Sequence, residues 1–436
     1  MAQLLAVVGS WAWFHVHHPL GNLLTGDSIG RLLAWGRLAG LLAGLALLFQ
    51  LVLIGRVRWV ERCCGLDRLT RLHHILGFAL LPLLFLHLLL VTLGHAAQAD
   101  VGYWAQTVDF FKTWRGLLAG GMGLALMVAA AGFSALVLMK RLRYEAWYAT
   151  HLALYAAFAL VFWHQVVAGS DFTDHPAFKY YWVALTAFAL ASLVAYRFAR
   201  PAALLSKHRF VVERLVAESS EVTSVYIGGR GLSSFRVEAG QFLIVRFLAS
   251  GFRWEAHPFS VSCCPDGQRL RLSVKAVGDF TRRIPELKPG TPVLIDGPHG
   301  AFTSRACVSD RALLIAGGIG ITPVRALAEE WAAAGRDAVV VYGNRNAATL
   351  VFRAELEALV ARSQGKLRVH YVMSDDPAWA GEAGRVDRER LVRLVPDLLA
   401  RDVYLCGPPP MMRGVRAALS ELGFPRAHLH DERFAL

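Results

Sequence analysis

Cysteine is scarce in this chain and follows no ligand pattern. Six cysteines occur in 436 residues, as two adjacent pairs and two single residues: Cys63, Cys64, Cys263, Cys264, Cys307 and Cys406. The absence of any Cys-x-x-Cys spacing excludes the usual zinc and iron–sulfur motifs, and this arrangement gives no disulfide framework. We therefore expect ordinary reduced thiols.

Charge is also sparse. Charged residues make up 18% of the chain and hydrophobic residues 55%, and the mean hydropathy is +0.41, which excludes a wholly soluble protein. The net charge of +13 does not indicate nucleic acid as a partner. The basic residues flank apolar segments and are not interleaved with stacking aromatics.

Long apolar runs are missing from the second half of the chain but fill the first two hundred residues, and the two parts meet near residues 196–207. Five runs have about the 20 residues that a membrane-spanning helix needs. A sixth run, 2–15, is short and lacks the basic start and cleavage site of a signal peptide, so we interpret it as a marginal first span. The five predicted spans are 38–55, 73–94, 116–139, 147–168 and 180–199.

The loops between these spans differ in charge. Arginine and lysine gather in the loops on one side, and the opposite loops carry aspartate with few basic residues, so the positive-inside rule predicts a cytoplasmic N-terminus. We expect an integral membrane protein, with the lipid bilayer as its surroundings. The basic loop residues are Arg56, Arg58, Arg62, Arg68, Arg71, Lys140, Arg141 and Arg143.

Four histidines lie inside the apolar spans, His73 and His87 in one and His151 and His164 in another. An imidazole in a membrane span is costly unless something binds it. Fourteen residues of helix rise about 21 Å and return to the same face, so one helix could serve two levels of the bilayer. Two such pairs suggest two stacked haems.

The second pair fits this geometry less well. Thirteen residues turn the rings of His151 and His164 roughly 140° apart, so that helix would need a kink, a π-bulge or divergent side-chain directions. A satisfied polar residue in a helix bundle is the alternative for any one of these histidines. His74 is an alternative to His73, although it stands about 100° round the helix.

The rest of the chain divides into two patterns. Short strands separated by turns, from about 207 to 304, predict a small antiparallel barrel, and strands alternating with helices from about 310 predict a parallel sheet. The expected fold is multi-domain: an α-helical transmembrane bundle, an antiparallel β-barrel and an α/β Rossmann-like domain. The expected domain limits are 1–200, 207–305 and 310–436.

Two loops of the sheet could bind a nucleotide. A glycine-rich loop follows a strand and opens a helix, where backbone amides favour phosphate, and a second loop follows a later strand at the same sheet edge. An ordinary turn is the alternative for either loop. The first loop contains Gly317, Gly318, Gly320, Thr322 and Pro323, and the second Cys406, Gly407, Pro408, Pro409, Pro410 and Met411.

Several motifs together resemble a known family. They are His-Pro-Phe-Ser at 257–260, Lys-Ala-Val-Gly-Asp-Phe-Thr at 275–281, Gly-Pro-His-Gly at 297–300 and the two loops above. They resemble the flavin and nicotinamide domains of the ferredoxin-reductase-like superfamily. Joined to a six-span bis-histidine part, the chain resembles bacterial members of the NADPH oxidase and ferric reductase family.

The resemblance implies cofactors and site residues. The implied cofactors are FAD, NADPH (or NADH) and two b-type haems, with His73 and His151 on the inner haem and His87 and His164 on the outer haem. The residues implied for FAD are His257, Pro258, Phe259, Ser260, Lys275, Gly278, Thr281 and Arg282. Those implied for the nicotinamide nucleotide are the two loops, with Cys406 and Phe434 at the reacting rings.

On the outer side, Arg37, taken as the start of its span, matches a family arginine that favours an anionic oxygen species; an interfacial anchor is the alternative. In the oxidases of the family a further histidine lies one turn beyond the outer ligand, and here that position is Val91. The electron acceptor is therefore either oxygen or, as the alternative, a ferric chelate or a periplasmic redox protein.

The end of the second sheet strand carries Arg345 and no acidic residue. An arginine there accommodates the 2′-phosphate of NADPH, whereas an acidic residue would bind the ribose of NADH. The alternative is that Arg345 is a surface residue in a salt bridge, which would give the same sequence pattern.

The sequence thus predicts a transmembrane NAD(P)H oxidase that makes superoxide or peroxide, with a reductase on the same scaffold as the alternative. An alternative of another class is a haem-carrying membrane sensor or transport protein. No particular protein partner is indicated.

Overall fold

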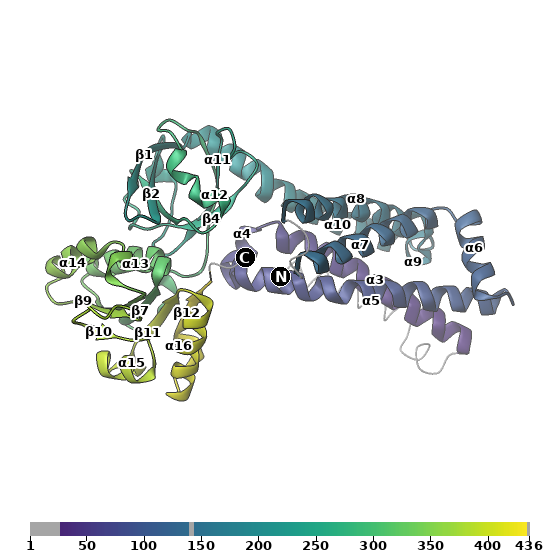
Figure 1. The fold of residues 1–436 in the computed structure, drawn as a ribbon. Coiled ribbons are helices and arrows are strands. Elements are labelled where there is room, and N and C mark those ends of the chain that lie inside the picture. Colours follow the sequence, from purple (N-terminus) through teal and green to yellow (C-terminus); the bar gives the residue numbers. More distant parts are fainter. Residues whose placement is uncertain (1–26, 139–143, 434–436) are drawn as a thin grey trace. The chain divides into compact units, whose positions relative to one another are not determined.

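The computed structural model describes residues 27–138 and 144–433, and contacts divide the chain into two compact units (Figure 1). One unit comprises the residues up to Gly55 together with Thr70–Val194, and the other comprises Arg56–Leu69 and the residues from Ala195 on. The predicted limits at 1–200, 207–305 and 310–436 remain predictions. The predicted marginal span at 2–15 lies outside the described residues.

The first unit consists of helices. Its long helices are α3 (Ser28–Ile54), α5 (Leu66–Gln98), α7 (Leu117–Leu138), α8 (Tyr144–Ala168) and α10 (Pro176–Val194), and its short ones are α6 (Tyr103–Thr113) and α9 (Ser170–Thr173). Within the described residues, five helices are long and apolar enough to cross a membrane, at the five predicted locations. Many large apolar side chains on them are exposed, as a lipid-facing surface requires.

Two helix limits differ from the prediction. Helix α3 begins ten residues before the predicted start at 38, because the Asp27 carboxylate accepts a hydrogen bond from Gly30 N at 2.9 Å and caps the helix there. The last span was predicted at 180–199, but α10 runs on through a π-helical turn, Ala195–Ala199, into α11 (Arg200–His208). The predicted break at 196–207 is therefore helical.

Small residues allow the helices of the first unit to approach closely. Gly36, Gly40 and Gly44 form a stripe along one face of α3, at the four-residue spacing typical of packed membrane helices. A Cβ atom would lie 2.8 Å from Val91 at Gly36 and 2.7 Å from the His87 ring at Gly40. Alanines and leucines of α3, α5, α7 and α8 fill the centre of the bundle.

The second unit begins with a six-stranded antiparallel barrel. It is built from two sheets, with strand orders β1-β2-β5 and β4-β3-β6, joined by bridges at Val211–Pro292 and Val261–Leu272. Its interior is a continuous apolar core. The strands are β1 (Val211–Ala217), β2 (Val222–Gly228), β3 (Phe242–Phe247), β4 (His257–Ser260), β5 (Leu270–Lys275) and β6 (Val293–His299), and helices α4 (Arg58–Cys64) and α12 (Asp279–Arg282) accompany them.

A parallel sheet with the order β10-β9-β8-β7-β11-β12 follows the barrel. Alternate residues of its central strands face opposite sides, so that helices cover both faces: Leu314 packs towards α13 and Leu313 towards α16. The elements are β7 (Arg311–Gly317), α13 (Ile321–Ala333), β8 (Asp337–Asn344), α14 (Arg353–Arg362), β9 (Leu367–Met373), β10 (Glu382–Ala383), α15 (Arg388–Leu394), β11 (Asp402–Cys406), α16 (Pro409–Glu421) and β12 (Leu429–Glu432). The predicted fold class is confirmed.

Candidate active site

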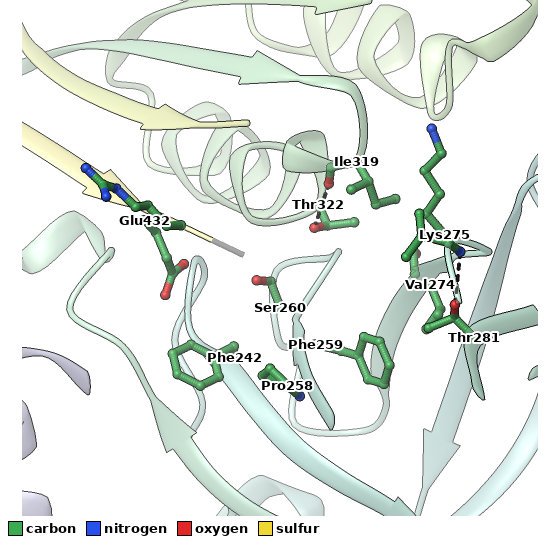
Figure 2. A pocket seen from close by; sticks show the side chains of 13 residues that line it. Phe242, Pro258, Phe259, Ser260, Val274, Lys275, Thr281, Ile319, Thr322 and Glu432 are labelled. Atoms are coloured by element: carbon green, nitrogen blue, oxygen red, sulfur yellow. Dashed lines mark hydrogen bonds between the residues drawn. The ribbon is translucent and has the colours of Figure 1, made fainter. Parts of the chain in front are cut away.

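A cavity of about 180 Å³ lies where the barrel faces the parallel sheet, both within the second unit. Barrel strands β3, β4 and β5 supply one wall, and the start of α13 and the end of β12 supply the other (Figure 2). The lining residues are Phe242, Pro258, Phe259, Ser260, Ser273, Val274, Lys275, Val277, Thr281, Ile319, Thr322, Glu432 and Arg433. Six residues named from the sequence are among them, drawn from both predicted nucleotide-binding parts.

The His-Pro-Phe-Ser motif is strand β4, at the edge of its sheet, where a proline costs no ladder hydrogen bond. Pairing with β3 aligns Ser260 with Phe242 and turns Pro258, Phe259 and Ser260 to the cavity (Figure 2). The Ser260 hydroxyl is buried without a hydrogen-bond partner among the described residues. A buried hydroxyl of this kind is suited to a bound ligand's polar atom.

His257 is the member of the motif that does not line the cavity. Its ring packs on the Phe280 ring at 4.0 Å between centroids, and its Nε2 lies 3.1 Å from a Glu255 carboxylate oxygen. It therefore supports the strand from outside.

The predicted phosphate turn is closed by its own threonine. Thr281 Oγ1 accepts hydrogen bonds from the backbone amides of Val277 and Gly278, each at 3.0 Å, and Thr281 also lines the cavity. Arg282 is exposed and lies 3.8 Å from Asp279. The turn thus presents a fixed backbone beside the cavity and a solvent-facing guanidinium next to it.

The two glycine-containing loops pack against each other. A Cβ at Gly320 would lie 2.4 Å from the Cys406 carbonyl oxygen, and one at Gly407 would lie 3.0 Å from Gly317 N. These glycines are therefore required by the contact between the loops. Gly318 differs, because it has a φ of +51° and open space around it, so its backbone is the part of the loop that a ligand can approach.

Residues near Gly318 continue the site towards the end of β8. A second cavity of about 20 Å³ is lined by Gly318, Asn344 and Thr349, and by Lys275, which also lines the first cavity and lies 3.2 Å from Glu221. Arg345, directly after β8, is exposed.

Two acidic residues that follow strand β9 lie beside Arg345, and they were not predicted from the sequence. Asp375 N donates a hydrogen bond to the Arg345 carbonyl at 2.8 Å, and Asp376 Oδ2 accepts one from Ala347 N at 2.9 Å. The Asp376 carboxylate is held by backbone amides, and the exposed Arg345 side chain lies beside this turn.

Four further residues complete this part of the site. Thr322 is buried and donates to the Ile319 carbonyl at 3.0 Å, and Cys406 is fully buried in the apolar core, with Pro323 and Pro408 nearby at the starts of their helices. Phe434 lies outside the described residues.

Glu432 is one of the cavity residues that were not predicted from the sequence. It lies at the end of β12 and is 7% exposed, and Figure 2 shows its carboxylate turned into the cavity opposite Ser260. The only signal in the sequence is its position two residues before Phe434. Short polar strands such as β12 carry no hydrophobic pattern that would announce them.

The inner pair of histidines is His73 on α5 and His151 on α8. Their ring centroids are 6.2 Å apart at an angle of 63°, and Nδ1 of each is buried without a hydrogen-bond partner among the described residues. A metal ion bound between two imidazoles, at about 2 Å from each nitrogen, would separate the centroids by roughly 6 Å. His73 therefore fits such a site, whereas the His74 side chain is exposed.

The outer pair, His87 and His164, has the same spacing, with 6.5 Å between centroids. His87 Nδ1 lies 2.8 Å from the Gly36 carbonyl oxygen, which orients its ring. Gly40 on α3 and Gly120 on α7 back the two rings: a Cβ at Gly120 would lie 2.8 Å from His164 Cγ. Because the imidazole rings occupy this space, any residue larger than glycine would clash with them at either position.

The angular misfit predicted for α8 does not prevent the pairing. Helix α8 is α-helical throughout Tyr144–Ala168, with no π-bulge, while α5 contains Pro82 between its two histidines. Divergent side-chain directions, which the sequence analysis had allowed, account for the two facing pairs.

Arg37 was expected at the start of its span, and this was wrong: α3 begins at Ser28, so Arg37 lies more than two turns inside the helix. It follows Gly36, whose carbonyl meets His87, and its charge acts on His95. His95 is two turns beyond His87 on α5 and packs on Trp114 at 5.2 Å. From the sequence, only Val91, one turn beyond His87, was considered, so His95 was not predicted.

Comparison with known families bears on the whole arrangement. Residues 39–162 match the ferric reductase like transmembrane component, residues 212–303 match an FAD-binding domain, and residues 314–417 match the oxidoreductase NAD-binding domain. Together, the three matches have the domain architecture of the ferric reductase-like family, as the resemblance in the sequence implied. The chain accordingly combines a ferric reductase-like transmembrane part with FAD- and NAD-binding oxidoreductase domains.

Individual relatives match the second unit. The chain is 34% identical over 219 residues to ferredoxin–NADP reductase B of Sorangium cellulosum, covering 46% of this chain and 86% of that one. It is 32% identical over 235 residues to a flavohemoprotein of Xylella fastidiosa, covering 52% of this chain but only 58% of the relative. Among solved structures, the FAD/NAD-binding domain of nitric oxide dioxygenase from Vibrio cholerae is 26% identical with a TM-score of 0.47, over 51% of this chain and 97% of that chain.

Proposed function

We propose that this ferric reductase-like protein oxidises cytosolic NAD(P)H and delivers the electrons across the bacterial inner membrane, with FAD and two b-type haems as bound redox groups. The acceptor on the opposite side is oxygen, which gives superoxide or peroxide. The proposal rests on two facing pairs of histidines on the same two helices. The ring centroids are 6.2 Å apart in one pair and 6.5 Å apart in the other.

Several features support two haems. Each pair has a spacing that would fit one iron between its two imidazoles, and the pairs are separated by fourteen residues of α5, or about 21 Å of helix rise, which fits two groups at different depths. Each pair would supply two imidazole ligands to one haem, and a haem held in this way favours electron transfer over ligand binding at iron. The apolar cluster of Ala43, Leu80 and Ala157 lies in the same bundle and excludes water.

The residues of the second unit would hold the other groups. When bound, nicotinamide and flavin supply hydride chemistry and haem supplies one-electron steps. Pro258 and Phe259 would pack against the flavin ring, and Ser260 would hydrogen-bond one of its polar atoms, at the strand where its hydroxyl has no protein partner. Glu432 would hold or release a proton on the opposite wall of the cavity.

NADPH is the proposed nucleotide. The path from the cavity past Gly318 ends at Asn344 and the exposed Arg345, whose guanidinium suits a 2′-phosphate. Cys406 and Phe434 retain the roles at the nicotinamide that the resemblance implied, as part of this proposal.

Oxygen is favoured by Arg37, which lies one residue from the carbonyl that orients His87 and would attract an anionic product. A ferric chelate or a periplasmic redox protein is the second candidate, favoured by Val91 in the position where the oxidases of the family carry histidine. Superoxide-dependent reduction of cytochrome c by the purified protein tests the choice. We expect superoxide dismutase to abolish the reduction; reduction that survives it would favour the second candidate.

A membrane sensor or transport protein that carries haem but has no redox activity makes a different prediction. Addition of NADPH and FAD would then leave the haem oxidised, whereas the proposed function requires its reduction.

A further inference from the structure

A cluster of charged side chains is buried where the segment Arg56–Leu69 meets the barrel, both inside the second unit. His299, at the end of β6, is 1% exposed, and Glu61, on α4, is 3% exposed. No bound group and no step of the proposed function uses these residues. Buried charges are costly unless paired, so their arrangement requires an explanation.

The imidazole of His299 lies between two carboxylates. Its Nε2 is 3.2 Å from Asp296 Oδ1, and its Nδ1 is 3.9 Å from Glu61 Oε2. Glu61 Oε1 also accepts a hydrogen bond from Gly300 N at 2.6 Å. The histidine is thus the link between a strand of the barrel and the helix of the Arg56–Leu69 segment.

Other charged groups face the cluster from the elements around it. Arg56, just before α4, lies 2.5 Å from Asp296 Oδ2, and Arg200 on α11 lies 3.8 Å from Asp296 Oδ1. From β12, the Glu432 carboxylate approaches Gly300, where a Cβ would lie 3.1 Å from Glu432 Oε1. Asp296 is therefore shared between two arginines, whereas Glu61 has only His299 as a cationic side-chain neighbour in the contacts described.

The titration of His299 depends on these neighbours. Burial alone would lower the pKa of His299, but its hydrogen bond to Asp296 and its charge interactions with Asp296 and Glu61 raise the pKa above the usual 6.5. Burial would raise the pKa of Asp296, but His299 and Arg56 bring it down to about 2. The arrangement therefore favours the protonated form of the His299 imidazole.

We propose that protonated His299 is a pH-dependent latch that holds the segment Arg56–Leu69 on the barrel. The segment is the covalent connection between α3 and α5, and it belongs to the same compact unit as the barrel. Leu66 packs on Phe242 and Ile244 beside the latch, and Phe242 also lines the large cavity. Release of the latch therefore loosens a wall of the cavity without unfolding the barrel.

The direction of the pH effect follows from the raised pKa. The contribution of His299 is complete below pH 6.5, the value of a free histidine, and is lost as the pH rises through the higher value of the docked state. Above that pH the imidazole is neutral, and the contacts described for Glu61 no longer include a cationic side chain. The Arg56–Asp296 pair persists, so docking weakens and is not abolished.

Hydrogen exchange of the full-length protein in lipid nanodiscs tests the latch. Protection of the amides in residues 56–69 would be measured between pH 5.5 and 9 and divided by the unstructured exchange rate at each pH. We expect protection to fall about tenfold for each unit by which the pKa of His299 is raised. The pH midpoint reports the titrating group directly.

Three variants identify that group. His299→Gln should give the weakly protected state at every pH, and Glu61→Gln should move the midpoint to lower pH because one raising charge is gone. His208→Gln is the matched control, since His208 is also 1% exposed but is hydrogen-bonded only to the Arg230 carbonyl at 2.9 Å. It should keep the wild-type profile.

The result that would overturn the latch is protection that does not change with pH in the wild type, or a midpoint that Glu61→Gln leaves in place. Loss of FAD content would show that the His299→Gln variant does not fold. In that case the pH profile of the wild type and the midpoint of Glu61→Gln still test the latch. Because the readout is exchange and not electron transfer, the latch and the proposed function can fail independently.

Discussion

His87 and His164 face each other across α5 and α8 with 6.5 Å between their ring centroids, and a glycine backs each ring. The same two helices carry a second facing pair, His73 and His151. Both pairs lie within one compact unit. The proposed haem sites can therefore be tested in the membrane part and the proposed nucleotide sites in the reductase part, each by its own variants.

The space behind His164 gives the first prediction. Gly120→Ala would put a Cβ 2.8 Å from His164 Cγ, so the ring must move and the outer haem should be lost or weakened. We expect the haem-to-protein ratio to fall from about two towards one. Gly132→Ala, on the same helix with nothing within 4 Å of its Cβ, is the control and should keep both haems.

Ser260 gives a prediction about the flavin. Ser260→Ala removes a buried hydroxyl that has no protein partner among the described residues, so folding should be unaffected. The loss of one hydrogen bond of about 1 kcal/mol should weaken FAD binding about fivefold. Titration with FAD followed by flavin fluorescence measures this. The exposed Ser234, changed to alanine in parallel, should leave the affinity as it is; equal weakening in both variants would count against a role at the flavin.

Nucleotide choice should depend on Arg345. Arg345→Glu places a carboxylate at the end of β8, where it repels a 2′-phosphate and can accept hydrogen bonds from a ribose. We expect the ratio of kcat/KM for NADPH to that for NADH to fall by roughly tenfold or more. Arg362→Glu, at the far end of α14, reverses the same charge on the surface and should leave the ratio unchanged.

The charge cluster under the parallel sheet gives a prediction about acid stability. Arg401 is fully buried and lies 3.1 Å from Asp337 and 2.8 Å from Asp397. Its hydrogen bond and charge lower the pKa of Asp397, and they lower that of Asp337 despite its burial. Their contribution is therefore present above the unfolded value of 3.8 and is lost as the pH falls through the depressed values.

Removal of that arginine should weaken this dependence of stability on pH. We expect Arg401→Met to lose about 2 kcal/mol near neutral pH, discounted because both carboxylates are partly exposed, and to lose less as the pH falls towards 3. Thermal unfolding of the full chain followed by differential scanning calorimetry measures this. A deficit of the same size at both pH values would show that packing, not charge, explains the loss.

Strong periodic signals made most of the fold predictable. The spans and the buried strands of the sheet carry long apolar runs or the buried pattern of a parallel strand, and each was found. Strand β4 was missed as a strand although its residues were named, because four residues with a proline give no alternation. The start of α3 was missed because the span was taken to begin at 38, next to Arg37, whereas an aspartate cap at Asp27 extends the helix to Ser28.

The candidate site was predictable where a motif spans neighbouring residues. Pro258, Ser260 and Thr281 line the cavity as expected. Glu432 was missed because a lone acidic residue in a short strand carries no pattern, and the buried cluster at His299 was missed because Glu61 is more than two hundred residues away in the chain. Contacts between distant segments depend on packing that periodicity does not encode.

The central claim is that electrons from the nucleotide reach haem inside the membrane part of the same chain. Anaerobic titration of the purified, FAD-loaded protein with NADPH, followed at the haem absorption bands, tests it most directly. The account predicts reduction of two low-spin haems per chain, and loss of haem in His73→Ala and His164→Ala. Haem that stays oxidised in excess NADPH while the flavin is reduced, or full haem content in both variants, would contradict it.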